Sequence, residues 1–316
     1  MPKVSIIVPV YGVEQYIERC ARSLFEQTLD DIEYLFIDDC SLDHSIDILK
    51  QVLEEYPHRK NQVIIHRMEK NSGQAAVRKW GMLNATGDYV IHCDSDDWVD
   101  ITMYEKMYKK AVEEDSDVII CDYYKSDTIN HTEIKVLKKP MDHDTYFRAL
   151  LCHKLQPSVC NKLVRRDLCK DNLVFPTQNM GEDLVLMVQI IKRSKKISYL
   201  SQPLYYYYSN AESITGLKSF ENVKKRVLQL KENVLLIQKY LIEKGLDIKY
   251  KKEIVNLKIF TRTESFKCEN DIQWQQFWNS IFQDLSIFDV ITDKYTSVKH
   301  KILYILAEME IYRIIR

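Results

Sequence analysis

Hydrophobic positions in the first 121 residues alternate between two spacings. Short, continuous apolar runs rich in β-branched residues are typical of strands buried on both faces of a sheet. Between these runs, apolar residues recur every three or four positions, which is typical of helices with one buried face. The predicted strands are Val4–Val10, Ile32–Ile37, Val63–Ile65, Tyr89–Cys93 and Val118–Cys121. The predicted helices lie within Val13–Phe25, Ile46–Tyr56, Ala75–Ala85 and Met103–Val112. This alternation predicts a Rossmann-like, mostly parallel sheet flanked by helices.

The pattern changes twice further along the chain. Residues 125–215 lose the regular alternation and contain four of the seven prolines, although Tyr205–Tyr208 keeps the two-residue repeat of a strand. From Phe220 onward, apolar residues return at helical spacing. Further helices are expected at Ile254–Phe266, Trp274–Leu285 and Val298–Ile315. We therefore expect an α/β domain over residues 1–215 and a helical C-terminal extension over residues 216–316.

Composition excludes several classes of protein. The formal net charge of -1 gives no bulk attraction to nucleic acid, so no nucleic-acid partner is expected. The eight cysteines contain no CxxC pair, and their apolar surroundings indicate buried thiols in a reducing, cytoplasmic environment. Neither a signal-peptide pattern nor a bilayer-length apolar run is present. Any contact with the inner face of a membrane should therefore be peripheral.

Acidic residues follow two of the predicted strands, where open α/β sheets bind their ligands. Asp94-Ser95-Asp96-Asp97 follows the fourth strand. Such closely spaced carboxylates suit a hard divalent cation, Mn²⁺ or Mg²⁺, whose coordination phosphate oxygens would complete. That cation would neutralise the charge developing on a diphosphate leaving group. The alternative is a helix cap, but three carboxylates within four residues repel one another without a counter-ion, which favours the metal.

Three other segments carry candidate chemistry. Asp38-Asp39 ends the second strand, where a carboxylate can bind a ribose or base, or cap the helix near Asp43. The segment from Asn71 to Ala76 precedes the third helix, whose N-terminus favours anions, and Gly73 allows close backbone approach. Glu182-Asp183 precedes another apolar helical run, where acids either complement the helix dipole or include a catalytic base. The tyrosines of Tyr205–Tyr208 either pack in the core or stack on a sugar.

These motifs, in this order, resemble glycosyltransferase family 2, whose members are inverting enzymes of GT-A fold, and especially the bacterial capsule and O-antigen enzymes. The matching segments are Val4–Tyr11, Ile37–Asp43, Asn71–Arg78, Gly87–Asp97, Asn161–Leu163, Phe175–Pro176 and Glu182–Asp183. The specificity of the match comes from the ordered set, since each motif alone occurs in unrelated proteins.

The resemblance implies a role for each candidate residue. It implies nucleotide contacts by Pro9, Tyr11, Asp39, Asn71, Gly73, Asp94 and Ser95. It implies a divalent metal on Asp96 and Asp94. It implies that Asp183, the second member of the acidic pair with Glu182, is the catalytic base.

The sequence departs from the family pattern at two places. Cys40 stands where the family has a glycine, so its turn must accept a Cβ atom. Tyr208 and Asn210 stand where arginines are common, and if those arginines hold the diphosphate, Lys162 or Arg165 is a substitute. The QxxRW motif of processive synthases is absent, which favours transfer of a single sugar.

The resulting expectation is an inverting hexosyl- or N-acetylhexosaminyltransferase. It would move a sugar from a UDP-sugar to a saccharide or lipid-linked acceptor in cell-surface polysaccharide synthesis. Dehydrogenase GxGxxG and P-loop motifs are absent. The alternative is a non-catalytic sugar- or partner-binding protein of the same fold, against which Asp94, Asp96 and Asp183 argue.

The last predicted helix has an apolar face beside Lys294, Lys299, Lys301, Arg313 and Arg316. This helix packs on its neighbours, forms a homodimer, or rests on a membrane, although Glu308 and Glu310 interrupt its basic face.

Overall fold

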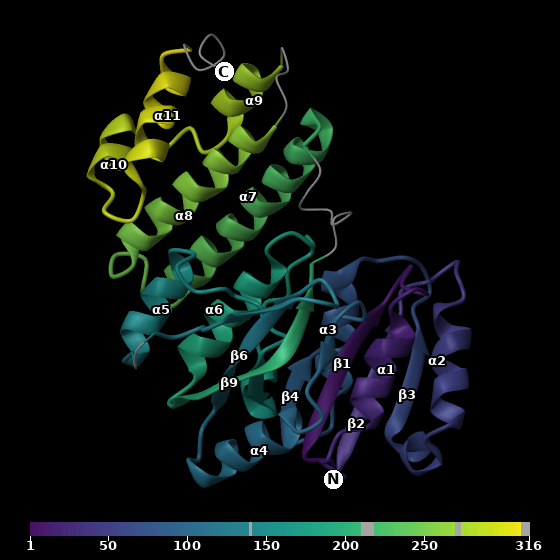
Figure 1. The fold of residues 1–316 in the computed structure, drawn as a ribbon. Helices are drawn as coiled ribbons and strands as arrows, with labels where there is room; N and C mark the ends of the chain where they lie inside the picture. The colour runs from purple at the N-terminus through teal and green to yellow at the C-terminus, as the bar shows by residue number, and fades with distance from the viewer. Residues whose placement is uncertain (139–140, 210–217, 269–272, 311–316) are drawn as a thin grey trace. The chain divides into compact units, whose positions relative to one another are not determined.

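The computed structural model describes residues 1–138, 141–209, 218–268 and 273–310, and the chain forms two compact units (Figure 1). The first, here called the sheet unit, comprises Met1–His143, Pro157–Thr177 and Gln189–Asn210. The second, the helical unit, comprises Asp144–Gln156, Gln178–Val188 and Ala211–Arg316. The two-domain division at residue 215 stays a prediction.

The sheet unit is built on one mixed sheet. Its strand order is β3-β2-β1-β4-β8-β6-β9-β5, and β7 pairs with β6. The first five strands along the chain are β1 (Val4–Val10), β2 (Ile32–Asp38), β3 (Val63–Arg67), β4 (Tyr89–His92) and β5 (Trp98–Val99). The others are β6 (Val118–Ser126), β7 (His131–Ile134), β8 (Lys162–Arg165) and β9 (Ile197–Tyr208). Pairing is parallel from β3 to β4, and β8 then enters antiparallel to both β4 and β6. The expected α/β fold with a helical C-terminal region is confirmed.

The predicted helices of this unit are all present. They are α1 (Ile17–Phe25), α2 (Ser45–Glu54), α3 (Gln74–Asn84) and α4 (Met103–Glu113). Right-handed crossovers place α1 and α2, which contact each other, on one face of the sheet. The connection from β3 to β4 crosses the sheet in the opposite direction, past β2 and β1. The same rule therefore places α3 on the opposite face, against β1. This reversal beside β1 is the point where open α/β sheets bind ligands.

A proline lies inside the central strand β1, which normally disfavours proline because the residue lacks an N–H. The ladder between β1 and β4 ends at Ile7 and His92, two residues before Pro9. Beyond His92 the chain leaves the sheet and forms the acidic turn at residues 94–97. Pro9 therefore lies where β1 no longer pairs with β4.

Gly81 and Gly87 lie where the backbone packs closely on β1. A Cβ atom at Gly81 of α3 would lie 2.5 Å from Ile7 Cγ2. A Cβ atom at Gly87 would lie 2.8 Å from the Ser5 backbone nitrogen. These two contacts bring α3 and the turn before β4 directly onto β1.

The helical unit contains five helices between residues 218 and 310, apart from the undescribed residues 269–272. They are α7 (Phe220–Glu243), α8 (Lys251–Thr263), α9 (Trp274–Ser280), α10 (Ile287–Thr292) and α11 (Val298–Glu308). The prediction of one helix over Trp274–Leu285 is wrong. Phe282 adopts a left-handed conformation (φ 47°), and Ser286 begins α10 with a capping box to Asp289. Two more helices, α5 (His143–Leu151) and α6 (Glu182–Arg193), contribute residues to both units.

Two further sequence expectations concern the whole chain. All eight cysteines are free thiols and seven are buried, so their predicted packing is confirmed. Across the described residues, no helix has both the length and the apolar character needed to cross a bilayer.

Candidate active site

The ends of β1, β2 and β4 bring most of the predicted site residues to one edge of the sheet. Because β2 and β4 both pair in parallel with β1, their carboxyl ends lie at the same edge. Pro9 is half-buried near the end of β1, and Tyr11 follows with 53% of its surface exposed. The edge therefore combines an exposed aromatic ring with carboxylates from the two strands that flank β1.

Asp39 fastens the turn before α3 to the end of β2. Its Oδ1 accepts the backbone N–H of Ser72 at 2.7 Å, and its Oδ2 accepts that of Gly73 at 2.8 Å. Gly73 precedes α3 with a φ of 83°, a conformation that glycine adopts without steric cost. Asn71, two residues earlier, is exposed. The structure thus brings Asp39 and Gly73 together, with Asn71 on the same turn.

The neighbouring residues of this turn have structural partners. Asp38 accepts the Ser41 N–H at 2.7 Å and binds Arg67 at 2.5 Å. Neither Asp38 nor Asp39 caps α2, because the cap position is His44 and the Ser45 N–H at the start of the helix donates to Asp43 Oδ1 at 3.2 Å. Cys40 has a φ of 64°, so the turn does accept a Cβ atom in the left-handed region that favours glycine.

The carboxylate of Asp94 is held by side chains of α3. Arg78 Nη2 lies 2.6 Å from Asp94 Oδ1, and Gln74 Nε2 lies 3.2 Å from the same oxygen. Only 5% of the Arg78 side chain is exposed, so the ion pair is largely shielded from water. The Asp94 side chain is therefore oriented by two polar groups one helical turn apart.

The surroundings of Asp96 disfavour its ionised form. Burial, followed by repulsion from Asp94, raises the pKa of Asp96 to about 6. Ser95 between them is buried, and both aspartates are half-buried. A cation at these two carboxylates would offset the repulsion that raises this pKa.

Asp97 has a structural role, although it binds a strand and does not cap a helix. It is buried, and it accepts hydrogen bonds from the hydroxyl of Tyr205 and, at 2.6 Å, from the backbone N–H of Tyr208. Burial, and then repulsion from Asp96 and Asp94, raises the pKa of Asp97 well above its usual range. Asp97 therefore fastens the acidic turn to β9, and Asp94 and Asp96 form the remaining pair.

The tyrosines of β9 divide between core and surface. Tyr205 is buried beneath the acidic turn, where its hydroxyl also accepts the Asp94 N–H at 3.2 Å. Tyr206 stacks on Trp98 with a centroid separation of 5.2 Å. Tyr207 is 44% exposed. Burial raises its pKa, and the carboxylates of Asp97, Asp96 and Asp94 raise it further. Tyr207 is thus the exposed ring next to these aspartates.

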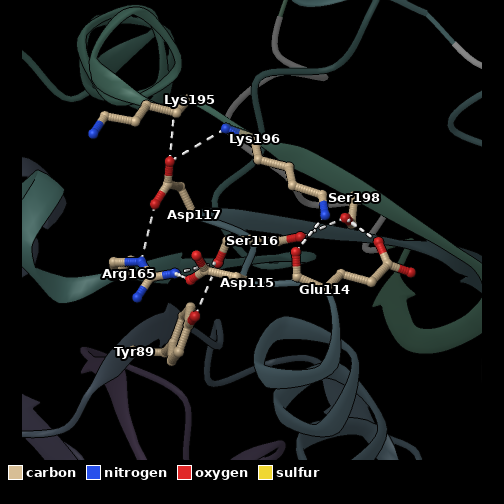
Figure 2. A network of polar contacts seen from close by, with 9 residues as sticks. All are labelled: Tyr89, Glu114, Asp115, Ser116, Asp117, Arg165, Lys195, Lys196 and Ser198. Carbon is tan, nitrogen blue, oxygen red and sulfur yellow. Dashed lines mark hydrogen bonds and ion pairs between the residues drawn. The ribbon is translucent and has the colours of Figure 1, made fainter.

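Arg165 is excluded as the substitute for the missing arginines, and Figure 2 shows why. It binds Asp117 at 2.9 Å and Asp115 at 2.7 Å, and its guanidinium lies 5.5 Å from the ring centroid of Tyr89. Tyr89 is the first residue of β4, opposite the end that delivers the acidic turn. Lys162 is buried and donates to Ser158 O at 2.7 Å and Asn161 Oδ1 at 2.9 Å. The segment from Asn210 to Thr215 lies outside the described residues.

Glu182 and Asp183 begin α6 and belong to the helical unit. Glu182 is 3% exposed, whereas Asp183 is half-buried. Asp183 Oδ1 accepts the backbone N–H of Leu184 at 2.8 Å. Gly181, just before the pair, has a φ of 78°. Of the two carboxylates, Asp183 is therefore the more accessible to a substrate.

Sequence reasoning assigned no role to three polar residues at this edge. Gln74 and Arg78 lie within a matched motif, and their four-residue spacing was the signal that both face the same way from α3. Arg19 of α1 donates to the backbone oxygen of Asp96 at 2.8 Å. It belongs to no motif, and only the packing of α1 against the acidic turn reveals it.

The chain is similar in sequence to known glycosyltransferases. GlyA, a glycosyltransferase of Streptococcus pneumoniae, is 30% identical over 259 residues, which are 78% of this chain and 36% of GlyA. TarS of Staphylococcus aureus, a poly(ribitol-phosphate) β-N-acetylglucosaminyltransferase, is 26% identical over 90% of this chain and 49% of TarS. The chain therefore spans half or less of these two relatives.

Solved structures show the same fold. The structure of TarS residues 1–349 in complex with UDP-GlcNAc matches with a TM-score of 0.73 and 21% identity, over 98% of this chain and 89% of that one. The mannosyltransferase PcManGT of Pyrobaculum calidifontis, in complex with GDP-Man and Mn²⁺, matches with a TM-score of 0.55 and 14% identity, over 98% and 87%. The family model described as "Glycosyl transferase family 2" matches residues 5–173, more than half of the chain. The chain belongs to glycosyl transferase family 2.

Proposed function

We propose that this protein transfers a sugar, with inversion, from a UDP-sugar to an acceptor hydroxyl. The observation that carries the proposal is the Asp94–Asp96 pair, which follows β4 at the sheet edge where Asp39 also lies. A nucleotide-sugar needs a surface for its base and ribose beside a site for its diphosphate. The exposed Tyr11 ring and the turn fastened by Asp39 offer the first, and the carboxylate pair offers the second through a cation.

The donor set fits a divalent cation such as Mn²⁺ or Mg²⁺. Asp94 and Asp96 provide hard oxygen ligands, and burial and mutual repulsion disfavour the ionised form of Asp96 when no cation is bound. Within the described ranges, no group of three or more His, Cys, Asp or Glu side chains is arranged to hold a metal by itself. Asp94 and Asp96 would hold the cation together with phosphate oxygens of the donor, and the cation would supply charge stabilisation to the departing diphosphate.

The chain's own residues orient the donor. Arg78 and Gln74 hold the Asp94 carboxylate, and Asp39 fixes the turn that lies along the nucleotide. Asn71 and Ser95 belong to the same two turns. Because these groups are held before the donor binds, little free energy is spent on reorganising them during transfer.

Asp183 is the proposed base. Its position at the start of α6 favours the ionised form through the helix dipole. An ionised carboxylate can take the acceptor's proton as the hydroxyl attacks the anomeric carbon from the face opposite the leaving diphosphate. The greater exposure of Asp183 supports it over the buried Glu182.

The names of the relatives support a role in cell-surface polysaccharide synthesis. TarS is named for transfer to poly(ribitol-phosphate), and its solved complex contains UDP-GlcNAc. We propose a UDP-linked hexose or N-acetylhexosamine as the donor and a saccharide or lipid-linked saccharide as the acceptor.

A thermal-shift screen tests the donor proposal. A ligand that binds the native state raises its melting temperature by mass action. UDP and UDP-sugars with Mn²⁺ should raise the melting temperature more than the same ligands without metal, and more than GDP. A larger shift with GDP or GDP-sugars would contradict the choice of UDP.

Asp39→Asn is expected to weaken UDP binding by about tenfold while changing the maximal rate by less than about threefold. The Ser72 and Gly73 N–H groups bind different oxygens of the carboxylate, and the amide replaces one of these oxygens with an NH2 donor that faces an N–H group. The turn then loosens equally in the ground and transition states. Steady-state kinetics with varied donor measure the split. A change confined to the acceptor's KM would contradict this role.

The outer face of α11 is proposed to contact an anionic membrane surface. Val298 and Ile302 are 73% and 52% exposed, and Lys299 is exposed beside them. Glu308 is withdrawn from this face because it binds Arg262 at 2.8 Å. Arg313 and Arg316 lie outside the described residues.

The protein should therefore float with liposomes that contain anionic lipid, and Ile302→Glu should reduce the floating fraction severalfold. Absence of flotation together with a dimer in solution would assign the face to a second copy instead.

A further inference from the structure

Helix α1 holds the backbone of the acidic turn and of the β5 segment that follows it. Ser23 Oγ accepts the Val99 N–H at 3.3 Å, and Gln27, just beyond the helix, donates to the Asp100 oxygen at 2.8 Å. The Cys20 thiol lies 3.8 Å from the Asp94 oxygen. Arg19 donates through Nη2 to the oxygen of Asp96 at 2.8 Å. The backbone of residues 94–100 is therefore held along the length of α1.

Arg19 is the charged member of this set, and its side chain is fixed by aromatic rings. Its guanidinium carbon lies 3.8 Å from the ring centroid of Trp98 and 5.0 Å from that of Tyr208. Trp98 also stacks on Tyr206, which stacks in turn on Tyr124. Planar contacts of this kind orient a guanidinium and stabilise its charge. Arg19 therefore presents Nη2 to the turn in one orientation.

Two arginines from opposite faces of the sheet thus bind the acidic pair. Arg78 of α3 binds the side chain of Asp94, and Arg19 of α1 binds the main chain of Asp96. A hydrogen bond from a charged donor is roughly twice as strong as one between neutral groups. The Asp96 carboxylate accepts a hydrogen bond from its own backbone N–H, so its direction follows the main chain that Arg19 holds.

We propose that Arg19 is the positioning residue of the acidic turn: it fixes the Asp96 main chain so that the carboxylate is directed at a divalent cation bound together with a nucleoside diphosphate. This inference rests on the proposed function and extends it to a residue outside the matched motifs. Arg19 acts through Asp96 and needs no contact with the substrate.

The test compares manganese and UDP binding in Arg19→Met, which keeps an apolar chain against Trp98 but removes the donor. The dissociation constant of Mn²⁺ is measured by electron paramagnetic resonance at saturating UDP, and that of UDP without metal by calorimetry. We expect Mn²⁺ binding to weaken by about tenfold, because a charge-assisted hydrogen bond is lost, and metal-free UDP binding to stay within about twofold. Arg19→Lys, which keeps a charged donor, should recover most of the Mn²⁺ affinity.

Arg22→Met is the matched control. Arg22 lies one turn along α1 and binds Glu18 at 2.9 Å and Glu55 at 2.7 Å on the exposed side, so both affinities should be unchanged. Unaltered Mn²⁺ binding in Arg19→Met overturns the proposal, and so does an equal loss of metal-free UDP affinity, which would indicate general disruption. If Arg19→Met does not fold, Arg19→Gln replaces it with the same expected shift and the same contradicting results. A wild-type protein that binds no Mn²⁺ would overturn the metal site as well as the role of Arg19. Failure of the metal site is thus distinguished from failure of the Arg19 proposal alone.

Discussion

Asp96→Ala is expected to lower the rate of sugar transfer by about a thousandfold or more while leaving the fold intact. The variant removes one of the two proposed protein ligands to the cation, and electrostatic stabilisation of a leaving group accounts for changes of this size. Folding should tolerate the change, because burial and repulsion already make the ionised Asp96 unfavourable in the folded protein. Transfer assays with Mn²⁺, together with thermal melting, measure both effects.

Asp100→Asn is the control for Asp96→Ala. Asp100 lies four residues further along, and its Oδ1 accepts the Thr102 N–H at 2.9 Å. Loss of this charge should leave Mn²⁺ affinity unchanged. Normal turnover by Asp96→Ala would remove the metal assignment, whereas loss of folding in Asp96→Ala would show that Asp96 has a structural role like that of Asp97.

Asp183→Asn is expected to reduce the transfer rate by roughly a hundredfold or more and to leave donor affinity nearly unchanged. The amide keeps the shape of the side chain but cannot take the acceptor's proton. Single-turnover kinetics separate this effect from product release.

Glu182→Gln should cost much less activity than Asp183→Asn, because Glu182 is buried. Full activity of Asp183→Asn together with an inactive Glu182→Gln would identify Glu182, and not Asp183, as the base. Full activity of both variants would place the base elsewhere in the chain.

Strands and helices with a regular apolar period could be predicted from the sequence because burial alone specifies them. Val4–Val10 and Ile32–Asp38 are almost completely buried, so apolar residues dominate both strands, with Ser5 and Glu33 as polar interruptions. The short strand β5 and the antiparallel β8 have too few residues for any period to appear. Their place in the sheet is set by pairing with distant strands, which local sequence does not encode.

The candidate site divides in the same way. Asp39, Gly73, Asp94 and Asp96 stand at strand or helix ends, where both the resemblance and sheet topology point, although their roles stay predictions. Asp97 differs in role from Asp94 and Asp96 because it accepts a hydrogen bond from the hydroxyl of Tyr205, which is more than a hundred residues away in the sequence. Arg165 is likewise excluded as a diphosphate-binding residue because it binds Asp115 and Asp117 (Figure 2). Such long-range partners are visible only in the folded chain.

The most direct test of the account is the release of UDP from UDP-N-acetylglucosamine and UDP-glucose by the full chain with Mn²⁺ and a polyol-phosphate or saccharide acceptor. The account predicts acceptor-dependent release of UDP from at least one of these donors, loss of that release with a chelator, and its absence in Asp96→Ala. A non-catalytic binding protein would bind UDP-sugars and release no UDP with any acceptor. Metal-independent turnover, equal in the wild type and Asp96→Ala, would contradict the central claim that the Asp94–Asp96 pair acts through a divalent cation.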